Sequence, residues 1–352
     1  LIVVDGIFDG VDLRTVNTQL SWELGKLYGP GGIISKGNFD IYTSGAKSIE
    51  NNTHIRNDGI CNWEASCTEL TLHDGSVFEN YGSSAVLNII GDSTLIDYYS
   101  GTSSTAALLT NKYNANINIV NDGVSSSTFT NKIKMENTGI ILFNQTQNIV
   151  TLSGSFYSTS GSVTLASNQK ITIDQSNNNF IVEGNTSTYI QNGCLVDIKT
   201  SGDVLSISGN EVHFDGAIIS NAGTMNIGGY LNNSVLTANT SFTIQPYSSS
   251  RGLFNVKQFK SGSTPTFGVI NVKDADLTFV DSDNTLVIYE LTSEISNNDI
   301  NVESGNTISL IDTLTLKSAS AIHFNSGNDV NINNLIVVDG IFDGVDLRTV
   351  NT

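Results

Sequence analysis

The chain has 352 residues, 14% of them charged, with a formal net charge of −18 at pH 7 and a sequence pI near 4.3. An acidic surface repels phosphate backbones and anionic headgroups, which excludes nucleic acid as a partner and argues against binding to anionic membranes. With 39% hydrophobic residues the chain is too apolar to stay disordered, and no apolar run approaches the roughly 20 residues of a membrane-spanning helix. We therefore expect a folded protein, with no membrane insertion in this segment.

The chain begins and ends with the same 18 residues. The segment LIVVDGIFDGVDLRTVNT at 1–18 recurs without substitution at 335–352, an offset of 334 residues. Either a segment was duplicated artificially, or the sequence is a window on a longer chain in which a 334-residue unit recurs in tandem. The second explanation accounts for more, because the apolar pairs and turn residues continue through the junction without a Pro-rich or Ser-rich linker. We therefore expect one continuous unit over 1–334 and the start of the next tandem unit at 335–352.

The segment TVNTQLSWELGKLYGPGG at 15–32 differs from the rest of the sequence in the spacing of its apolar residues. Val16, Leu20, Leu24 and Leu27 have helix-like spacing, and the segment ends in Gly-Pro-Gly-Gly. The sequence leaves two alternatives here, a short lateral helix or a strand with a loop.

From there to the end, short apolar runs alternate with turns. Runs such as VLNII, ANINIV, SVTLAS and LVIYEL alternate with period two, and NDG, HDG and SNNN separate them. Asp-Gly turns could mark hairpins of a sandwich, but a looser recurrence of about twenty residues favours coils whose strands stack in parallel. We predict an all-β parallel β-helix, or β-solenoid, with about 17 coils in the 334-residue unit.

Two stretches carry a resemblance to a known family: IRNDGICNWEASCTELTLHDGSVFENYGSSAVLNI at 55–89 and ISGNEVHFDGAIISNAGTMNIGGYLNNSVL at 207–236. These stretches resemble the right-handed parallel β-helices of extracellular adhesins, autotransporter passengers and giant repetitive surface proteins. Nearly the whole chain shares the Asn-, Ser-, Thr- and Gly-rich composition of those proteins. The resemblance concerns architecture. It implies a right-handed coil and an extracellular or cell-surface location. It also implies a structural role in which the protein extends from a cell surface and often binds partners at its tip or sides.

Three Cys are too few for a disulfide-stapled small fold or a Cys-rich zinc cluster. Cys61 and Cys67 would lie about 20 Å apart in one extended strand. A disulfide needs Cα atoms within roughly 7 Å, so a bridge requires a tight turn at residues 64–66. Two alternatives stay open, a Cys61–Cys67 disulfide or two thiols buried in a core.

Parallel β-helices also include polysaccharide lyases and hydrolases, whose sites need convergent carboxylates beside a basic group. The candidate acids come from KDAD and VDSD: Asp274, Asp276, Asp281 and Asp283. They fall at strand ends, where Asp is equally expected as a turn former, and the chain has only four Arg. We predict no catalytic residue and no enzymatic activity.

Metal binding has little support in the sequence. Neither an EF-hand loop nor the Gly-Gly-x-Gly-x-Asp array of repeat toxins is present. No pair of histidines has metal-ligand spacing: His54, His73, His213 and His323. Incidental calcium could be held along Asp5, Asp9 and Asp12, or by Asp281 and Asp283, with solvated turns as the alternative. We predict no metal site and no cofactor.

Five Asn-x-Ser/Thr sequons would accept glycans in a secretory pathway that glycosylates. They lie at Asn51, Asn144, Asn185, Asn232 and Asn239. In a chain so rich in Asn, Ser and Thr several arise by chance, so the sequons permit glycosylation without requiring it.

We predict a non-enzymatic structural protein from the repeated segment, the uninterrupted junction and the scarcity of charged residues that could carry out chemistry. It would be an extracellular filament or adhesin stalk built from β-solenoid units stacked end to end. Its partner would be a further copy of itself, by continuation of the solenoid, with surface glycans or neighbouring filaments as additional partners. The alternative is a carbohydrate-binding or carbohydrate-cleaving β-helix protein, which a groove with acidic and aromatic side chains would favour.

Overall fold

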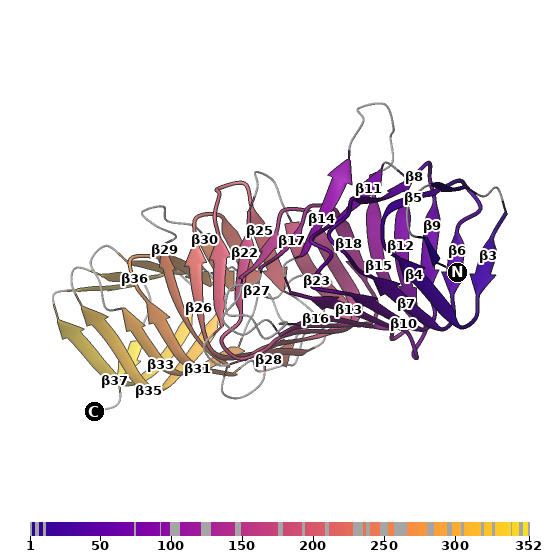
Figure 1. Ribbon diagram of the computed structural model, residues 1–352. Helices are drawn as coiled ribbons and strands as arrows, with labels where there is room; N and C mark the ends of the chain where they lie inside the picture. Colours follow the sequence, from indigo (N-terminus) through magenta and orange to yellow (C-terminus); the bar gives the residue numbers. More distant parts are fainter. Residues whose placement is uncertain are drawn as a thin grey trace. The chain divides into compact units, whose positions relative to one another are not determined.

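The computed structural model (Figure 1) describes residues 2–3, 7–9, 12–73, 75–91, 93–98, 106–120, 128–144, 149–174, 179–191, 194–207, 211–227, 235–236, 240–246, 253–256, 266–279, 285–293, 298–303, 306–317, 320–325, 328–338, 340–344 and 348–350. Every regular element within these ranges is a β-strand. The ranges contain no helix long and apolar enough to cross a membrane. The chain forms two compact units, Leu1–Ile171 and Thr172–Thr352, with β22 (Lys170–Ile173) at the division between them.

Unit 1 is a parallel β-solenoid with three strands in each coil, so each strand from β1 to β18 pairs with the strand three places later. The first face consists of β1 (Ile2–Val3), β4 (Gln19–Trp22), β7 (Asn38–Ile41), β10 (Ile60–Trp63), β13 (Val86–Ile90), β16 (Asn116–Val120) and β19 (Ile140–Asn144). The second consists of β2 (Ile7–Asp9), β5 (Gly25–Tyr28), β8 (Lys47–Glu50), β11 (Glu69–His73), β14 (Ser93–Tyr98), β17 (Thr128–Asn131) and β20 (Ile149–Leu152). The third consists of β3 (Arg14–Val16), β6 (Ile33–Ser35), β9 (His54–Asn57), β12 (Val77–Tyr81), β15 (Leu108–Lys112), β18 (Lys134–Asn137) and the start of β21 (Phe156–Leu165), whose end joins the first face.

The length of a coil varies more than the sequence suggested. Stacked side chains at the end of the third-face strands are separated by 23, 31, 26 and 21 residues. These spacings are all longer than the loose recurrence of about twenty residues from which the coil number was predicted. The parallel β-solenoid itself is confirmed, while its handedness and total coil number stay predictions.

Period-two alternation places one side of each strand in the interior. In β9, Ile55 and Asn57 are buried while His54 and Arg56 lie outside, and the neighbouring strands keep the same alternation. Stacking in register then builds continuous apolar columns, such as the one that runs Ile33, Ile55, Phe78, Leu109, Met135 and Phe156. Each coil thus buries its apolar side chains against its two neighbours.

The Asp-Gly turn at residues 58–59 is a corner between two faces. Asp58 and Gly59 separate β9 from β10, which pair with other coils and not with each other. A Cβ added at Gly59 would collide with the carbonyl oxygen of Gly37 at the same corner of the coil before. Glycine is required there because the backbones of stacked corners approach too closely for a side chain.

The helix-like spacing in residues 15–32 is a strand pattern in the structure. This segment contains β4 and β5, joined by Glu23 and Leu24, so the strand-with-loop alternative is confirmed. Trp22 is fully buried and donates its indole N–H to the carbonyl oxygen of Leu24 at 3.1 Å. Pairing with the next coil, as in Gln19 with Asn38, selects strand over helix.

Unit 2 is also a parallel β-solenoid. One column of strands consists of the start of β23 (Asn179–Ile190), β25 (Val204–Ile207), β27 (Thr224–Ile227), β30 (Leu253–Val256), β32 (Asp276–Phe279), β34 (Asp299–Val302), β36 (Ala321–Phe324) and β38 (Ile341–Gly344). The others are β24 (Leu195–Ile198), β26 (Glu211–Asn221), β28 (Val235–Leu236), β29 (Thr240–Pro246), β31 (Thr266–Val272), β33 (Thr285–Ser293), β35 (Thr307–Lys317), β37 (Asp329–Val338) and β39 (Arg348–Val350). Several are long because they continue around a corner through an irregularity, such as the register shift between Leu310 and Thr313.

Candidate functional site

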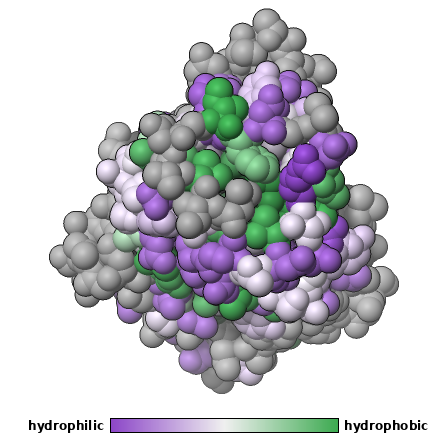
Figure 2. All heavy atoms as spheres, turned by 45° about the vertical axis from the view of Figure 1, so that its right-hand side comes forward, coloured by the Kyte–Doolittle hydropathy of each residue, from purple (hydrophilic) through white to green (hydrophobic). Residues whose placement is uncertain are grey.

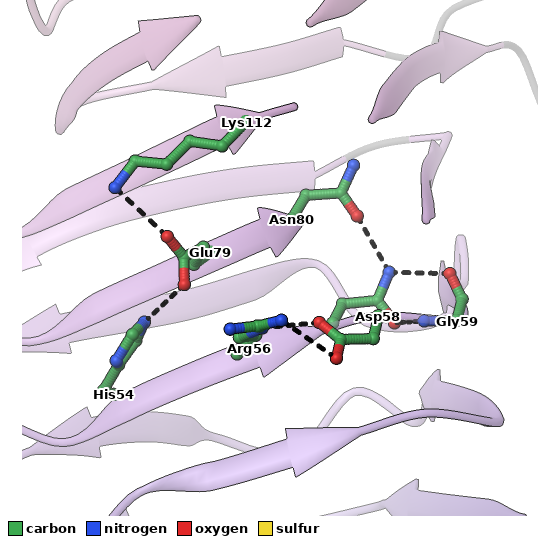
Figure 3. Close-up of polar contacts among 8 residues, drawn as sticks. His54, Arg56, Asp58, Gly59, Glu79, Asn80 and Lys112 are labelled. Atoms are coloured by element: carbon green, nitrogen blue, oxygen red, sulfur yellow. Dashed lines mark hydrogen bonds and ion pairs between the residues drawn. The ribbon is translucent and has the colours of Figure 1, made fainter. Parts of the chain in front are cut away.

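Charged side chains on the outer side of the third face of unit 1 are paired with one another (Figure 3). Glu79 accepts contacts from His54 Nε2 and Lys112 Nζ, each at 3.1 Å, and its side chain is only 8% exposed. Arg56 Nε lies 2.5 Å from Asp58 Oδ1. The contacts of Glu79 with His54 and Lys112 join three successive coils and tie neighbouring strands together, whereas Arg56 and Asp58 belong to one coil.

Tyrosines lie beside these ion pairs. The guanidinium of Arg56 lies 3.5 Å from the ring centroid of Tyr81, a distance typical of a cation–π contact. The ring of Tyr81 is 4.7 Å from that of Tyr113 at an interplanar angle of 57°. Tyr81 is thus held between Arg56 and Tyr113, whereas Tyr113 is 64% exposed.

The backbone at Tyr113 adopts a conformation that tyrosine disfavours. Tyr113 and Asn114 have φ of 56° and 63°, and the Ala115 N–H donates to the Lys112 carbonyl at 3.2 Å, which makes a type I′ turn. Asn51 and Asn52 make the same turn elsewhere in unit 1, with φ of 56° and 58°. Asn is a preferred residue for this turn and Tyr is not, so local structure does not explain Tyr113.

Two neighbouring hollows share Lys112 and Thr138, and Tyr113 lines the larger of them. The larger, about 640 Å³, is lined by Tyr113, Asn114, Glu79 and Ser160 besides the shared pair. The smaller, about 330 Å³, is lined by Lys134, Glu136, Tyr157 and Thr159 besides the shared pair. The Lys134 ammonium lies 2.6 Å from Glu136 and 5.4 Å from the ring centroid of Tyr157. We refer to both hollows together as the tyrosine groove.

A ladder of buried asparagines lies on the inner side of the same strands. Asn57, Asn80, Asn111 and Asn137 each donate a side-chain N–H to the next coil, at 2.8, 2.9, 2.8 and 2.8 Å, the last to Ser158 Oγ. The same amides also donate to corner carbonyls, as Asn111 does to Ala115 at 2.9 Å and Ile140 at 3.1 Å. The ladder fixes the corners from which the groove side chains project.

The two copies of the repeated segment fold into corresponding strands. In the first copy they are β1, β2 and β3; in the second they are the end of β37, then β38 and β39. Within the described residues, β1, β2 and β3 pair with the strands that follow them, β4, β5 and β6. The strands of the second copy pair with those that precede them, β35, β36 and β37.

Exposure of equivalent residues reflects this difference in pairing. Val3 in the first copy is 7% exposed beside Trp22, whereas Val337 in the second copy is 40% exposed. Ile7 and its equivalent Ile341 point outward in both copies and are 67% and 55% exposed. Figure 2, which brings forward the side of unit 1 with β3 and β6, shows apolar residues gathered amid hydrophilic ones.

The structure has Cys61 and Cys67 as free cysteines, both buried, which is the second of the two alternatives. Cys61 occupies an interior position of β10, and burial raises the pKa of its thiol well above the ordinary value. Burial also raises the pKa of the Cys67 thiol. Nearby Lys47 is 2% exposed, with Nζ donating to the carbonyls of Thr43 and Gly45 at 2.9 and 3.0 Å, and burial lowers its pKa. Cys194 is buried as well.

The carboxylates considered for catalysis or calcium are only partly within the described residues. Asp5, Asp281 and Asp283 lie outside them, as does the side chain of His213, while Asp9 and Asp12 are exposed. Asp276 pairs in register with Asp299, and His323 lies 3.5 Å from both Asp299 and Asp343. No group of three or more His, Cys, Asp or Glu suited to a metal occurs in the part of the chain that the structure describes.

Three of the five sequon asparagines are exposed: Asn51, Asn144 and Asn185. Asn232 and Asn239 lie outside the described residues. Glycosylation stays a prediction.

Sequence reasoning missed the tyrosine groove, because its members are spread over residues 79–160. The one local signal was NKYNAN at 111–116, a two-residue turn with Tyr where Asn or Gly is usual. The register that joins Glu79, Thr110 and Glu136 in one column is a property of the stacked coils alone.

No family model matches the chain, and no curated protein does. A solved structure that matches it is described as "Crystal structure of TibC-catalyzed hyper-glycosylated TibA55-350 fragment". The two are 11% identical, with a TM-score of 0.35, and the match covers 99% of this chain and 100% of that one. The fold of this chain is established by its own strand pairing: each unit is a parallel β-solenoid.

Proposed function

We propose that this chain is a structural protein, an extracellular filament or adhesin stalk in which 334-residue solenoid units continue into one another. The observation that carries the proposal is that the two identical copies of the repeated segment form corresponding strands, each in parallel register with a neighbouring coil. One copy is paired with the coil after it, and the other with the coil before it. A unit that followed the second copy with residues equivalent to 19 onward would complete both sides of that coil.

The columns of the two ends are compatible. Joined through the shared coil, Leu316, Val337 and Trp22 form one column, since Leu316 pairs with Val337 and the equivalent Val3 pairs with Trp22. Leu316 and Trp22 are both fully buried, so the valine between them would be enclosed by apolar neighbours. Ile322, Phe342 and Leu27 continue a second buried column in the same way.

Arg14 is the exception at this junction. It pairs with Ile33, and its equivalent Arg348 pairs with Val330, so an arginine occupies a column whose neighbours are buried. A charge that faces inward at a sheet edge discourages pairing with unrelated chains. In a continued solenoid the guanidinium requires a polar partner.

The test compares this chain with one that contains two consecutive units, by amide hydrogen exchange. In the two-unit chain the internal copy of the repeated segment would be paired on both sides, so its amides should exchange as slowly as those of β7 and β10. The copies at the two ends should exchange faster. An internal copy that exchanges as fast as the end copies would overturn the proposal.

The native polypeptide supplies the second measurement. A mass many times 37.6 kDa on a denaturing gel, with long thin filaments in electron micrographs, would agree with tandem units. A single species near 37.6 kDa seen as isolated particles would contradict it. The extracellular location is tested by labelling intact cells with an antibody against the chain, which should stain them without permeabilisation.

The proposal gives the chain no catalytic role. Incubation with polysaccharides should release no reducing or unsaturated ends, and Asp276→Asn should leave this result unchanged. Cleavage that Asp276→Asn abolishes would replace the structural proposal with the carbohydrate-cleaving alternative.

A further inference from the structure

We propose that the tyrosine groove of unit 1 binds a neutral oligosaccharide, with Tyr113 as its main contact. The inference is independent of end-to-end stacking, because every residue of the groove belongs to the interior coils of unit 1. Its starting point is Tyr113, a large aromatic side chain that is 64% exposed on a backbone with φ of 56°.

The turn at Tyr113 could form without tyrosine, so this residue needs an explanation other than folding. Asn51 and Asn52 make the same turn without an aromatic residue, so the fold does not require Tyr at the first central position. Bulky residues in the left-handed region are uncommon, and such outliers concentrate at binding sites. Tyrosine here costs conformational stability, and although its ring packs on Tyr81, the residue stays 64% exposed, which leaves ring surface for contact with a ligand.

The charges of the groove favour a ligand without net charge. Lys112 is paired with Glu79 and Lys134 with Glu136, and Arg56 beside them is paired with Asp58. Three cations and three carboxylates cancel, so the groove offers no surplus positive charge to a phosphate, sulfate or carboxylate. The net charge of −18 over the whole chain opposes anionic ligands further.

The remaining lining suits a sugar. Sugars combine apolar C–H faces with hydroxyl groups, and amphipathic tyrosine rings fit both. Tyr113 and Tyr157 provide rings in the two adjoining hollows, while Asn114, Thr138 and Ser160 provide amide and hydroxyl groups. Because the hollows share Lys112 and Thr138, one ligand that spans neighbouring coils can contact both rings.

The rigidity of the groove reduces the cost of binding. Its strands are held by the buried asparagine ladder on the inner side and by ion pairs between coils on the outer side. A preformed site loses little conformational entropy when the ligand arrives. The groove is therefore suited to repeated weak contacts, which tandem units would multiply through avidity.

The experiment measures binding of this chain to cellotetraose, maltotetraose, chitotetraose and mannotetraose by isothermal titration calorimetry, with a sulfated heparin tetrasaccharide as the charged comparison. We expect at least one neutral tetrasaccharide to bind and Tyr113→Asn to weaken it by tenfold or more. Tyr113→Asn should also keep or raise the melting temperature, because Asn prefers this turn. Tyr157→Ala should weaken the same ligand.

The matched control is Tyr289→Asn, which removes a tyrosine that is 45% exposed in unit 2 and should leave binding unchanged. The proposal is overturned if none of the neutral tetrasaccharides binds, if only the sulfated one binds, or if Tyr113→Asn binds like the unsubstituted chain. Equal losses in Tyr113→Asn and Tyr289→Asn would also overturn it, because the effect would then not belong to the groove.

Discussion

The side chains of Asn80 and Asn111 are joined across two coils of unit 1 by a hydrogen bond of 2.9 Å from Nδ2 to Oδ1. Both residues are fully buried, and each lies where a third-face strand ends. Buried amides are costly unless every donor and acceptor is satisfied. Here the next amide in the stack and the corner carbonyls satisfy them, so each asparagine depends on its neighbours.

We predict that Asn111→Ala destabilises unit 1 by about 3 kcal/mol or more, because it removes four hydrogen bonds at once, those with the side chains of Asn80 and Asn137 and those with the carbonyls of Ala115 and Ile140. Asn118 is the matched control: its amide donates to Asn88 Oδ1 at 3.0 Å, but it lies half-buried on the outer side of β16. Asn118→Ala should cost less than about 1 kcal/mol, since water replaces the lost contact. Urea unfolding measures both, and equal losses would contradict the distinction.

The cysteines give a chemical prediction. Because Cys61 and Cys67 are free and buried, with raised pKa values, the folded chain should resist alkylation at pH 8, and reductant should not change its free energy of unfolding. After denaturation without reductant all three Cys should react, as mass spectrometry would show. Modification of one Cys only would indicate the disulfide instead.

Glu50 gives a pH prediction. Burial alone would raise its pKa, but hydrogen bonds from Ser48 and Lys26 and the charge of His73 outweigh burial, so the pKa lies below the ordinary 4.5. A carboxyl whose folded pKa is depressed stabilises the fold above its unfolded pKa and loses that contribution as the pH falls through the folded value. The stability difference between the unsubstituted chain and Glu50→Gln should therefore shrink from pH 5 to about pH 3.

The control for Glu50 is Glu136→Gln, which removes an ion pair whose two side chains are 41% and 43% exposed. Exposed ion pairs contribute little to stability, so Glu136→Gln should change the free energy of unfolding by no more than about 1 kcal/mol at every pH. A Glu50→Gln difference that persists undiminished at pH 3 would contradict the stabilising role of the ionised carboxylate.

Val337 tests the junction between units. In this chain Val337→Asp should change stability by less than about 0.5 kcal/mol, since the side chain is 40% exposed. In a two-unit chain the equivalent internal valine would be buried, and the same change should cost about 3 kcal/mol or more. Ile341→Asp, which alters an outward residue, should be tolerated in both chains. Thermal unfolding of the one-unit and two-unit chains would measure these changes in stability. A two-unit chain that tolerates the internal Val→Asp change would count against the continuation of one solenoid unit into the next.

Part of the fold follows from the sequence alone. Alternation such as that in NINIV at 116–120 determines which side chains face inward, because successive residues of a strand point to opposite sides. Turn residues determine where corners fall, as at Asp58 and Gly59, where glycine leaves room for the backbone of the stacked corner. The repeated 18 residues likewise identify corresponding strands at both ends.

Other features were decided only by the tertiary structure. Leu20, Leu24 and Leu27 have the spacing of a helix, and pairing with the next coil made their segment two strands because it satisfies the backbone hydrogen bonds. The tyrosine groove likewise depends on pairing between coils. Its residues become neighbours through a register whose steps vary from 21 to 31 residues, and side-chain packing between coils sets those steps.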